Sequence, residues 1–114
     1  MDNNNILSIN KEVLAKMAGL AAAETEGVAS LARKTSDVKT IFHTGEFTRS
    51  VKVVAGEDGV EIAVYIKVAS GYVATRVAEA VQEKIKEEIE NMTGSTVAKV
   101  NVIVADVEFS EDEQ

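Results

Sequence analysis

The sequence predicts an α+β fold, a two-layer sandwich in which two helices cover one face of a mainly antiparallel sheet of three or four strands. Residues 75–93 place apolar side chains every four positions, as an amphipathic helix does. Residues 50–69 form two β-rich runs around a turn bounded by glycines, and a valine-rich run follows over 96–109. With another helix near the start and a short strand before it, the order is β-α-β-β-α-β.

The first helix is expected to begin at Lys11, because Asn10 is a suitable N-cap and Glu12 lies in the first turn, where a carboxylate is favoured. Gly27 is expected to end this helix. A short strand is expected over 6–9, and if that run does not pair, the sheet has three strands. The apolar stripe expected to face the sheet is Val13, Met17, Leu20 and Ala21.

Residues 32–50 mix charges and threonines without a sustained period, so a loop with one short turn around 38–42 is expected there. The run Gly56-Glu57-Asp58-Gly59 predicts a β-hairpin, because Asp-Gly favours the tight turn between antiparallel strands. In the strand after this turn, alternate residues are expected to face the helices, namely Val60, Ile62, Val64, Ile66 and Val68.

The second helix is expected to bury one stripe, to expose a charged side and to end at Gly94. Its buried stripe is Val77, Val81, Ile85 and Ile89. In the last strand, the wholly apolar alternate set is expected to point inward, namely Ala98, Val100, Val102 and Val104.

Composition limits the classes of function. The 114 residues fit a single domain, with flexible ends expected at 1–5 and 110–114. A formal charge of −7 disfavours binding to nucleic acid or to anionic lipid. The sequence has no cysteine, which excludes disulfides and thiolate chemistry and is consistent with a cytoplasmic protein. No apolar run approaches the length of about 20 residues that a membrane helix needs, so direct membrane insertion is not expected.

No group of residues points to a reaction. His43 is the single histidine, lies in the irregular segment and has no histidine partner with which to bind zinc. Glu83, Glu87 and Glu90 could hold a divalent cation, but carboxylates on an outer helix face are usually only solvated. We therefore expect no catalytic residue, no metal and no cofactor, and a protein that is not an enzyme.

The sheet face turned away from the helices is the best candidate for a binding site. Its expected outward residues are Ala63, Tyr65, Lys67, Lys99, Asn101 and Ile103, with Val54 beside them. This set is too apolar for a wholly solvated face and favours self-association or a partner surface, the alternative being a mildly apolar monomer surface. Tyr72, in the turn that leads into the second helix, is included in the same interface.

Glu24 is a further candidate, because a helical wheel places it in the middle of the expected apolar stripe of the first helix. It also lies near the helix C-terminus, where the helix dipole disfavours an anion. In one interpretation the helix frays before Gly27, so that Glu24 reaches water or pairs with a cation such as Arg33. In the other, Glu24 belongs to a partner site.

Three segments, 6–31, 60–94 and 97–109, together resemble the alkaline shock protein family, the envelope stress response proteins found mainly in Gram-positive bacteria. The most specific pieces of this resemblance are Ala22-Ala23-Glu24 through Glu26-Gly27-Val28, Val81-Gln82-Glu83, Met92-Thr93-Gly94 and Val100-Asn101-Val102. The sequence departs from the family pattern over 32–47, where a glycine-rich segment is usual, and it lacks a proline often found at the start of the second helix.

The resemblance implies a non-catalytic cytoplasmic protein that acts through protein–protein contacts, either at the cytoplasmic side of the membrane or in the regulation of lipid synthesis. The partners that it implies are further copies of the chain, in a homo-oligomer, and a membrane-anchoring or metabolic-enzyme protein. Membrane association would then come through that partner. A small-ligand-binding regulatory module is the alternative function.

Overall fold

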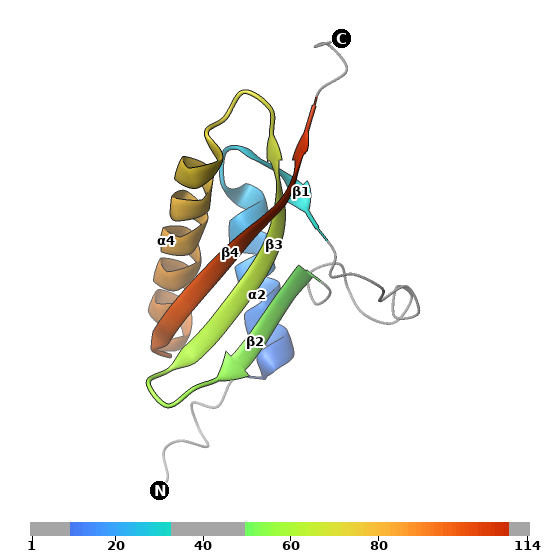
Figure 1. Cartoon of the computed structure of the whole chain (residues 1–114). Helices are drawn as coiled ribbons and strands as arrows, with labels where there is room; N and C mark the ends of the chain where they lie inside the picture. The colour runs from blue at the N-terminus through green and yellow to red at the C-terminus, as the bar shows by residue number, and fades with distance from the viewer. Residues whose placement is uncertain (1–9, 33–49, 110–114) are drawn as a thin grey trace, which may run out of the picture.

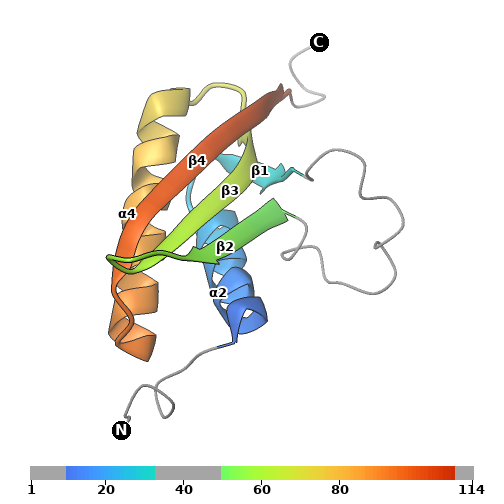
Figure 2. The ribbon, with the colours of Figure 1, turned by 60° about the horizontal axis from the view of Figure 1, so that its bottom comes forward.

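In the computed structural model, which describes residues 10–32 and 50–109, two helices pack against one face of a four-stranded sheet (Figure 1 and Figure 2). Along the chain the described elements are α2 (Lys11–Glu24), β1 (Val28–Leu31), β2 (Val51–Ala55), β3 (Val60–Ala69), α4 (Ala74–Thr93) and β4 (Val97–Glu108). The predicted α+β two-layer sandwich is confirmed. The strand expected at 6–9, the turn expected at 38–42 and His43 lie outside the described residues.

β3 is the central strand of the sheet. It pairs in parallel with β4 along its whole length on one side. On its other side it pairs antiparallel with β2 over its first half and with β1 over its second half. The sheet is therefore mainly antiparallel, as predicted. The predicted hairpin between β2 and β3 is also present, closed by the Gly56 N–H, which donates to the Gly59 carbonyl over 2.9 Å.

β1 is a strand that the sequence did not predict. It is four residues long and too short to show a period in the sequence. It forms because the second half of β3 has backbone groups still to be paired: the Ala69 N–H donates to the Gly27 carbonyl and the Ala32 N–H donates to the Tyr65 carbonyl, both over 2.8 Å.

The core lies between β3 and α4, and the predicted inward faces of both elements are confirmed. Val64 and Ile66 of β3 and Val81, Ile85 and Ile89 of α4 are all fully buried. α4 ends at Gly94, as predicted, with a φ of 76° in the left-handed region that glycine tolerates best.

The predicted inward stripe of the first helix is largely wrong. Val13 and Leu20 are 46% and 49% exposed, Met17 is half-buried, and only Ala21 of that stripe is fully inside. The face that packs is instead made of Leu14, Ala15, Ala18, Ala21 and Ala22. Two apolar sets lie on this helix, and the set of small residues is buried because it lets α2 approach both the sheet and α4 closely.

The inward set of β4 is confirmed for Val100, Val102 and Val104, which pack against the core, and is wrong for Ala98, which is exposed. Ala98 is an extra residue between Val97, opposite Val60, and Lys99, opposite Glu61. This bulge shifts the alternation by one residue, so that Val97 is buried in its place.

The two leucines of α2 test which face of this helix is inside. Leu14→Ala should lower the free energy of unfolding by about 2–4 kcal/mol, because Leu14 is only 4% exposed and its loss leaves a cavity. Leu20→Ala should change it by less than about 1 kcal/mol, since Leu20 is half exposed. Urea denaturation measures both, and equal losses would show that the assignment of faces is wrong.

Candidate functional site

The sheet face turned away from both helices, called the outer face below, is the near face of the sheet in Figure 1. Along β3 every second residue is buried under the helices, and the residues between them are half-buried or exposed. Residues directly opposite one another on paired strands point to the same face, so the register extends the outer face to the neighbouring strands. Its members are Ser30, Lys52, Val54, Glu61, Ala63, Tyr65, Lys67, Ala69, Lys99, Asn101, Ile103, Asp106 and Glu108.

The parallel register of β3 and β4 arranges the outer face in rows. From the amino to the carboxyl ends of the two strands, the rows are Glu61–Lys99, Ala63–Asn101, Tyr65–Ile103, Lys67–Asp106 and Ala69–Glu108. Tyr65 and Ile103 therefore lie side by side in the middle row, and both are half-buried. The centre of the outer face is an aromatic–aliphatic pair, and the charged residues lie toward the two ends of the strands.

Five of the predicted site residues lie together on this face, namely Tyr65, Lys67, Lys99, Asn101 and Ile103. The other two, Tyr72 and Glu24, lie elsewhere. The structure thus separates one surface patch from two isolated positions, and only the patch can act as a continuous contact area.

Tyr72 lies in the turn between β3 and α4 and is 45% exposed. Its hydroxyl donates to Glu26 Oε2 over 3.3 Å, and its ring lies against Gly27, where an added Cβ would be 3.0 Å from the ring. This corner borders a groove of about 450 Å³ that is lined by Thr25, Glu26, Gly71, Tyr72, Val73, Arg76, Val77 and Ala80. Tyr72 therefore packs at the end of the helix layer and is not part of the outer face.

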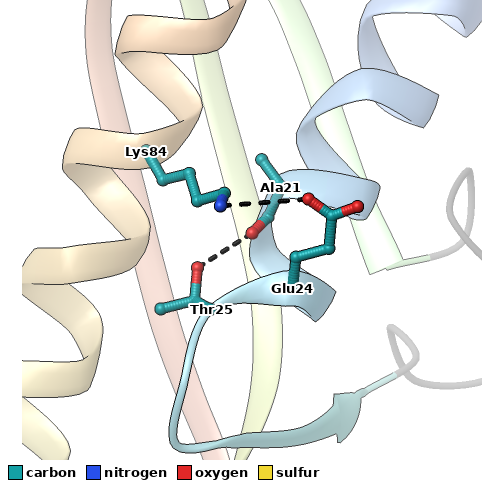
Figure 3. A network of polar contacts seen from close by, with 4 residues as sticks. All are labelled: Ala21, Glu24, Thr25 and Lys84. Carbon is teal, nitrogen blue, oxygen red and sulfur yellow. Dashed lines mark hydrogen bonds and ion pairs between the residues drawn. The ribbon is translucent and has the colours of Figure 1, made fainter.

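Glu24 lies on the helix layer, at the end of α2 (Figure 3). Its Oε1 is 3.9 Å from Lys84 Nζ of α4, and the two side chains are 60% and 36% exposed. Thr25, which follows it, is buried and donates its hydroxyl to the Ala21 carbonyl over 2.8 Å. The cation beside Glu24 is thus Lys84, whereas Arg33 lies outside the described residues. An ion pair this exposed contributes at most about 1 kcal/mol to stability.

α4 also holds the start of β4, the edge strand of the sheet. Gln82 Nε2 donates to the Val100 carbonyl over 2.9 Å, and Glu90 Oε2 accepts from the Val97 N–H over 3.0 Å. Side chains that occupy the backbone groups of an edge strand hinder its pairing with another strand. A contact through the outer face is therefore more accessible to a partner than a contact through this part of the edge.

The predicted set missed acidic members of the outer face at the carboxyl end of β4. Asp106 and Glu108 have even numbers, whereas the outward residues earlier in this strand have odd numbers. Ala105 is an extra residue between Val104, opposite Ile66, and Asp106, opposite Lys67. No feature of the sequence marks such a bulge. By contrast, Glu61 and Lys52 could have been found from the alternation of the hairpin strands alone.

Neither a metal cluster nor a membrane span is found in the described part of the chain. No group of three or more histidine or carboxylate side chains within residues 10–32 and 50–109 is placed to hold a metal ion. Neither described helix combines the length and the apolarity that would carry it across a membrane.

A profile of the alkaline shock protein 23 family, described as having a cell envelope-related function, matches residues 1–109. The chain therefore belongs to this family, and the predicted resemblance is confirmed. The uncharacterized protein YqhY of Bacillus subtilis (strain 168) is 33% identical over 104 residues, which cover 90% of this chain and 77% of YqhY. The uncharacterized protein YloU of the same organism is 32% identical over 104 residues, covering 89% of this chain and 87% of YloU.

Similar solved structures support the fold alone. The MamM CTD variant H264A-E289A-C267S has a TM-score of 0.60 at 16% identity, covering 86% of this chain and 96% of that chain. The manganese form of the MamM CTD variant E289D has a TM-score of 0.57 at 13% identity, covering 89% of this chain and all of the other. At this identity the likeness concerns the arrangement of helices and strands.

The corner at Tyr72 can be tested with two glycines of nearly equal backbone conformation. Gly27 and Gly71 have φ values of 97° and 95°, so alanine is strained by its backbone at both positions. At Gly27 the new Cβ would also lie 2.6 Å from Val77 Cγ2, whereas nothing lies within 4 Å at Gly71. Gly27→Ala should therefore lower the free energy of unfolding by about 1–3 kcal/mol more than Gly71→Ala does. Equal losses in urea denaturation would contradict the close packing of Tyr72 and Val77 on Gly27.

Proposed function

We propose that this chain is a non-catalytic interaction protein of the cell envelope, which acts through protein–protein contacts made by its outer face. The observation that carries the proposal is the middle row of that face, where Tyr65 and Ile103 lie side by side and partly exposed at the centre of the sheet. An aromatic–aliphatic centre with a polar rim is the common composition of a protein interface. The first partner proposed is a second copy of the chain.

Membership of an envelope-related family supports a place for such an assembly near the membrane. We place the protein at the cytoplasmic side, held there by a membrane-anchoring protein or acting on a metabolic enzyme of lipid synthesis. In this proposal a protein partner mediates the association with the membrane.

Two other surfaces of the molecule are less suited to this role. The exposed stripe of α2, with Val13 and Leu20, is apolar but interrupted by charged neighbours such as Lys16 and Glu24. The edge of β4 has backbone groups that Gln82 and Glu90 already occupy. The outer face combines apolar area with the support of three hydrogen-bonded strands, because β3 joins β2 and β4.

The double variant Tyr65→Glu with Ile103→Lys tests the proposal. It places two charges in the apolar centre of the outer face, so self-association should fall by at least about tenfold, because charged groups lose their hydration on burial in an interface. Light scattering over a concentration series measures self-association, and pull-down from a cell extract measures binding of a partner.

The matched control for this experiment is Val13→Glu with Leu20→Lys on α2, which makes the same kind of change on an exposed apolar surface of the helix layer. The control should associate as the unaltered chain does. Circular dichroism should show that both variants remain folded. Unchanged association of the Tyr65→Glu, Ile103→Lys variant would refute the proposed use of the outer face.

A small-ligand-binding regulatory module is the second candidate, and the groove beside Tyr72 favours it. Between the helices and the sheet, residues such as Ile66, Val81 and Ile85 are fully buried and form the core, so a groove at the surface is the better candidate for a ligand site. The corner groove of about 450 Å³ is open and contains Arg76, a cation suited to a phosphate or carboxylate. Thermal-shift screening against acyl and nucleotide compounds tests this function, since a ligand of the native state must raise the midpoint, and Arg76→Ala should abolish that rise.

A further inference from the structure

The charged residues of the outer face change sign from one end of the strands to the other. Toward the amino ends of β3 and β4, the face carries Lys52 and Lys99 against the single carboxylate of Glu61. The side chains of all three are exposed. The middle row, Tyr65–Ile103, carries no charge. This half of the outer face is therefore positive next to an uncharged centre.

The other half has the opposite balance. Toward the carboxyl ends of the strands, Lys67 lies opposite Asp106, and the next row adds Glu108. Asp106 uses Oδ1 to accept from the Val107 N–H over 2.8 Å, and Glu108 uses Oε1 to accept weakly from Ser30 Oγ over 3.4 Å. Each carboxylate therefore keeps its second oxygen for a further donor. The outer face is a dipole with a positive amino end, a negative carboxyl end and an apolar middle.

We propose that two copies of the chain stack outer face to outer face with their β3 and β4 strands antiparallel, related by a two-fold axis that passes through the Tyr65–Ile103 row. This arrangement rests on the self-association proposed above and specifies its geometry. A two-fold contact must be self-complementary, since the same patch is used by both copies. The outer face meets this condition only when its positive end lies over the negative end of the other copy.

In the antiparallel arrangement each strand lies over the same strand of the second copy. The first row of one copy, Glu61–Lys99, then meets the fifth row of the other, Ala69–Glu108. Lys99 therefore lies near Glu108 of the second copy, and this pair occurs twice in the dimer. Row two meets row four, so the Asn101 amide lies near Asp106 of the second copy and can donate to its second oxygen. Stacked sheets cross at about 30°, and the long Lys99 and Glu108 side chains can cover the resulting offset.

In the parallel arrangement every row of one copy meets the same row of the other. Because β3 is the central strand, it still lies over itself. Glu61 then opposes Glu61 of the second copy, and Lys67 opposes Lys67 of the second copy. Two like-charge contacts replace the opposite-charge contacts, which is unfavourable at an interface. Charge therefore selects the antiparallel arrangement.

The size of the face determines how strongly the two copies can bind. β3 has 10 residues and β4 has 12, and on the other side of β3 the short strands β2 and β1, of 5 and 4 residues, together cover a similar length. A sheet of this length and three strands in width, at about 3.3 Å per residue and 4.8 Å between strands, gives a footprint of roughly 500 Å² per copy. Stable dimers commonly bury about 800 Å² per partner, so the contact is a weak one. The experiment must accordingly cover concentrations from about 1 μM to 1 mM.

Charge exchange between Lys99 and Glu108 tests the arrangement by sedimentation equilibrium. Lys99→Glu and Glu108→Lys alone should each weaken self-association by about tenfold, because each variant places two like-charge contacts in the dimer. The double variant Lys99→Glu with Glu108→Lys restores opposite charges across the interface and should return to within about threefold of the unaltered chain. The controls Lys86→Glu and Glu87→Lys make the same charge changes on the exposed side of α4 and should have little effect.

The outcomes separate this arrangement from the proposed function. If Tyr65→Glu with Ile103→Lys abolishes association but the double charge variant is as weak as the single variants, the outer face is the interface and the antiparallel stacking is wrong. If that apolar variant associates normally, both the proposed function and the arrangement fail. Recovery in the double charge variant supports both.

Thiol-specific cross-linking gives a second measurement, because the sequence has no cysteine of its own. Stacked sheets lie about 10 Å apart, which is too far for a direct disulfide, so a bis-maleimide reagent that spans this distance is used. A mixture of Lys99→Cys and Glu108→Cys chains should then yield mainly the mixed dimer, which mass spectrometry distinguishes from either homodimer. Glu61→Cys should cross-link poorly with itself. Efficient self-cross-linking of Glu61→Cys, with little mixed dimer from the first pair, would establish the parallel arrangement and overturn the proposal.

Discussion

The packing of β3 against α4 is the contact on which the rest of the structure depends. Ile66, Val64, Ile85 and Ile89 meet with no exposed surface, and burial of such side chains contributes roughly 2–3 kcal/mol each. Because aromatic residues are only 4% of the chain, this aliphatic layer supplies most of the apolar burial. α2 completes the layer with alanines, whose small size allows it to lie close to both the sheet and α4. The outer face is supported from beneath by this layer of buried side chains.

The same layer decides which surfaces remain for a partner. Helix α4 covers β4 and binds its backbone through Gln82 and Glu90, so part of the sheet edge is occupied from within the chain. Helix α2 turns its alanines inward and leaves Val13 and Leu20 outside. The outer face is left with an apolar centre and a rim of both signs. The chain has a net charge of −7, and α4 carries more carboxylates than cations. The outer face, by contrast, carries charges of both signs. That contrast is why we propose association through the sheet and not through the helices.

Two bulges in β4 connect the fold to the charge pattern of this face. Without the extra residue Ala105, the alternation of β4 would turn Asp106 and Glu108 toward the helices and the core. With it, both carboxylates reach the outer face, Asp106 opposite Lys67 and Glu108 in the next row. The other bulge, at Ala98, brings Val97 into the core in place of an alanine. The bulge near each end of β4 thus keeps its valines in the core. The same bulges leave charges of opposite sign on the outer face at the two ends of the strand.

The sequence by itself determined the fold class, the hairpin at Gly56–Gly59, the buried stripe of α4 and the family, because each is written in local patterns of spacing or turn chemistry. It also determined Tyr65, Lys67, Lys99, Asn101 and Ile103 as one patch, since a strand alternates strictly between its bulges. Only the tertiary structure decided which of two apolar faces of α2 is buried, because that choice depends on how closely its neighbours approach. Only the tertiary structure placed β1 on β3, and Asp106 and Glu108 on the outer face, because strand pairing and bulges are set by the partner strand and leave no mark in the chain's own pattern.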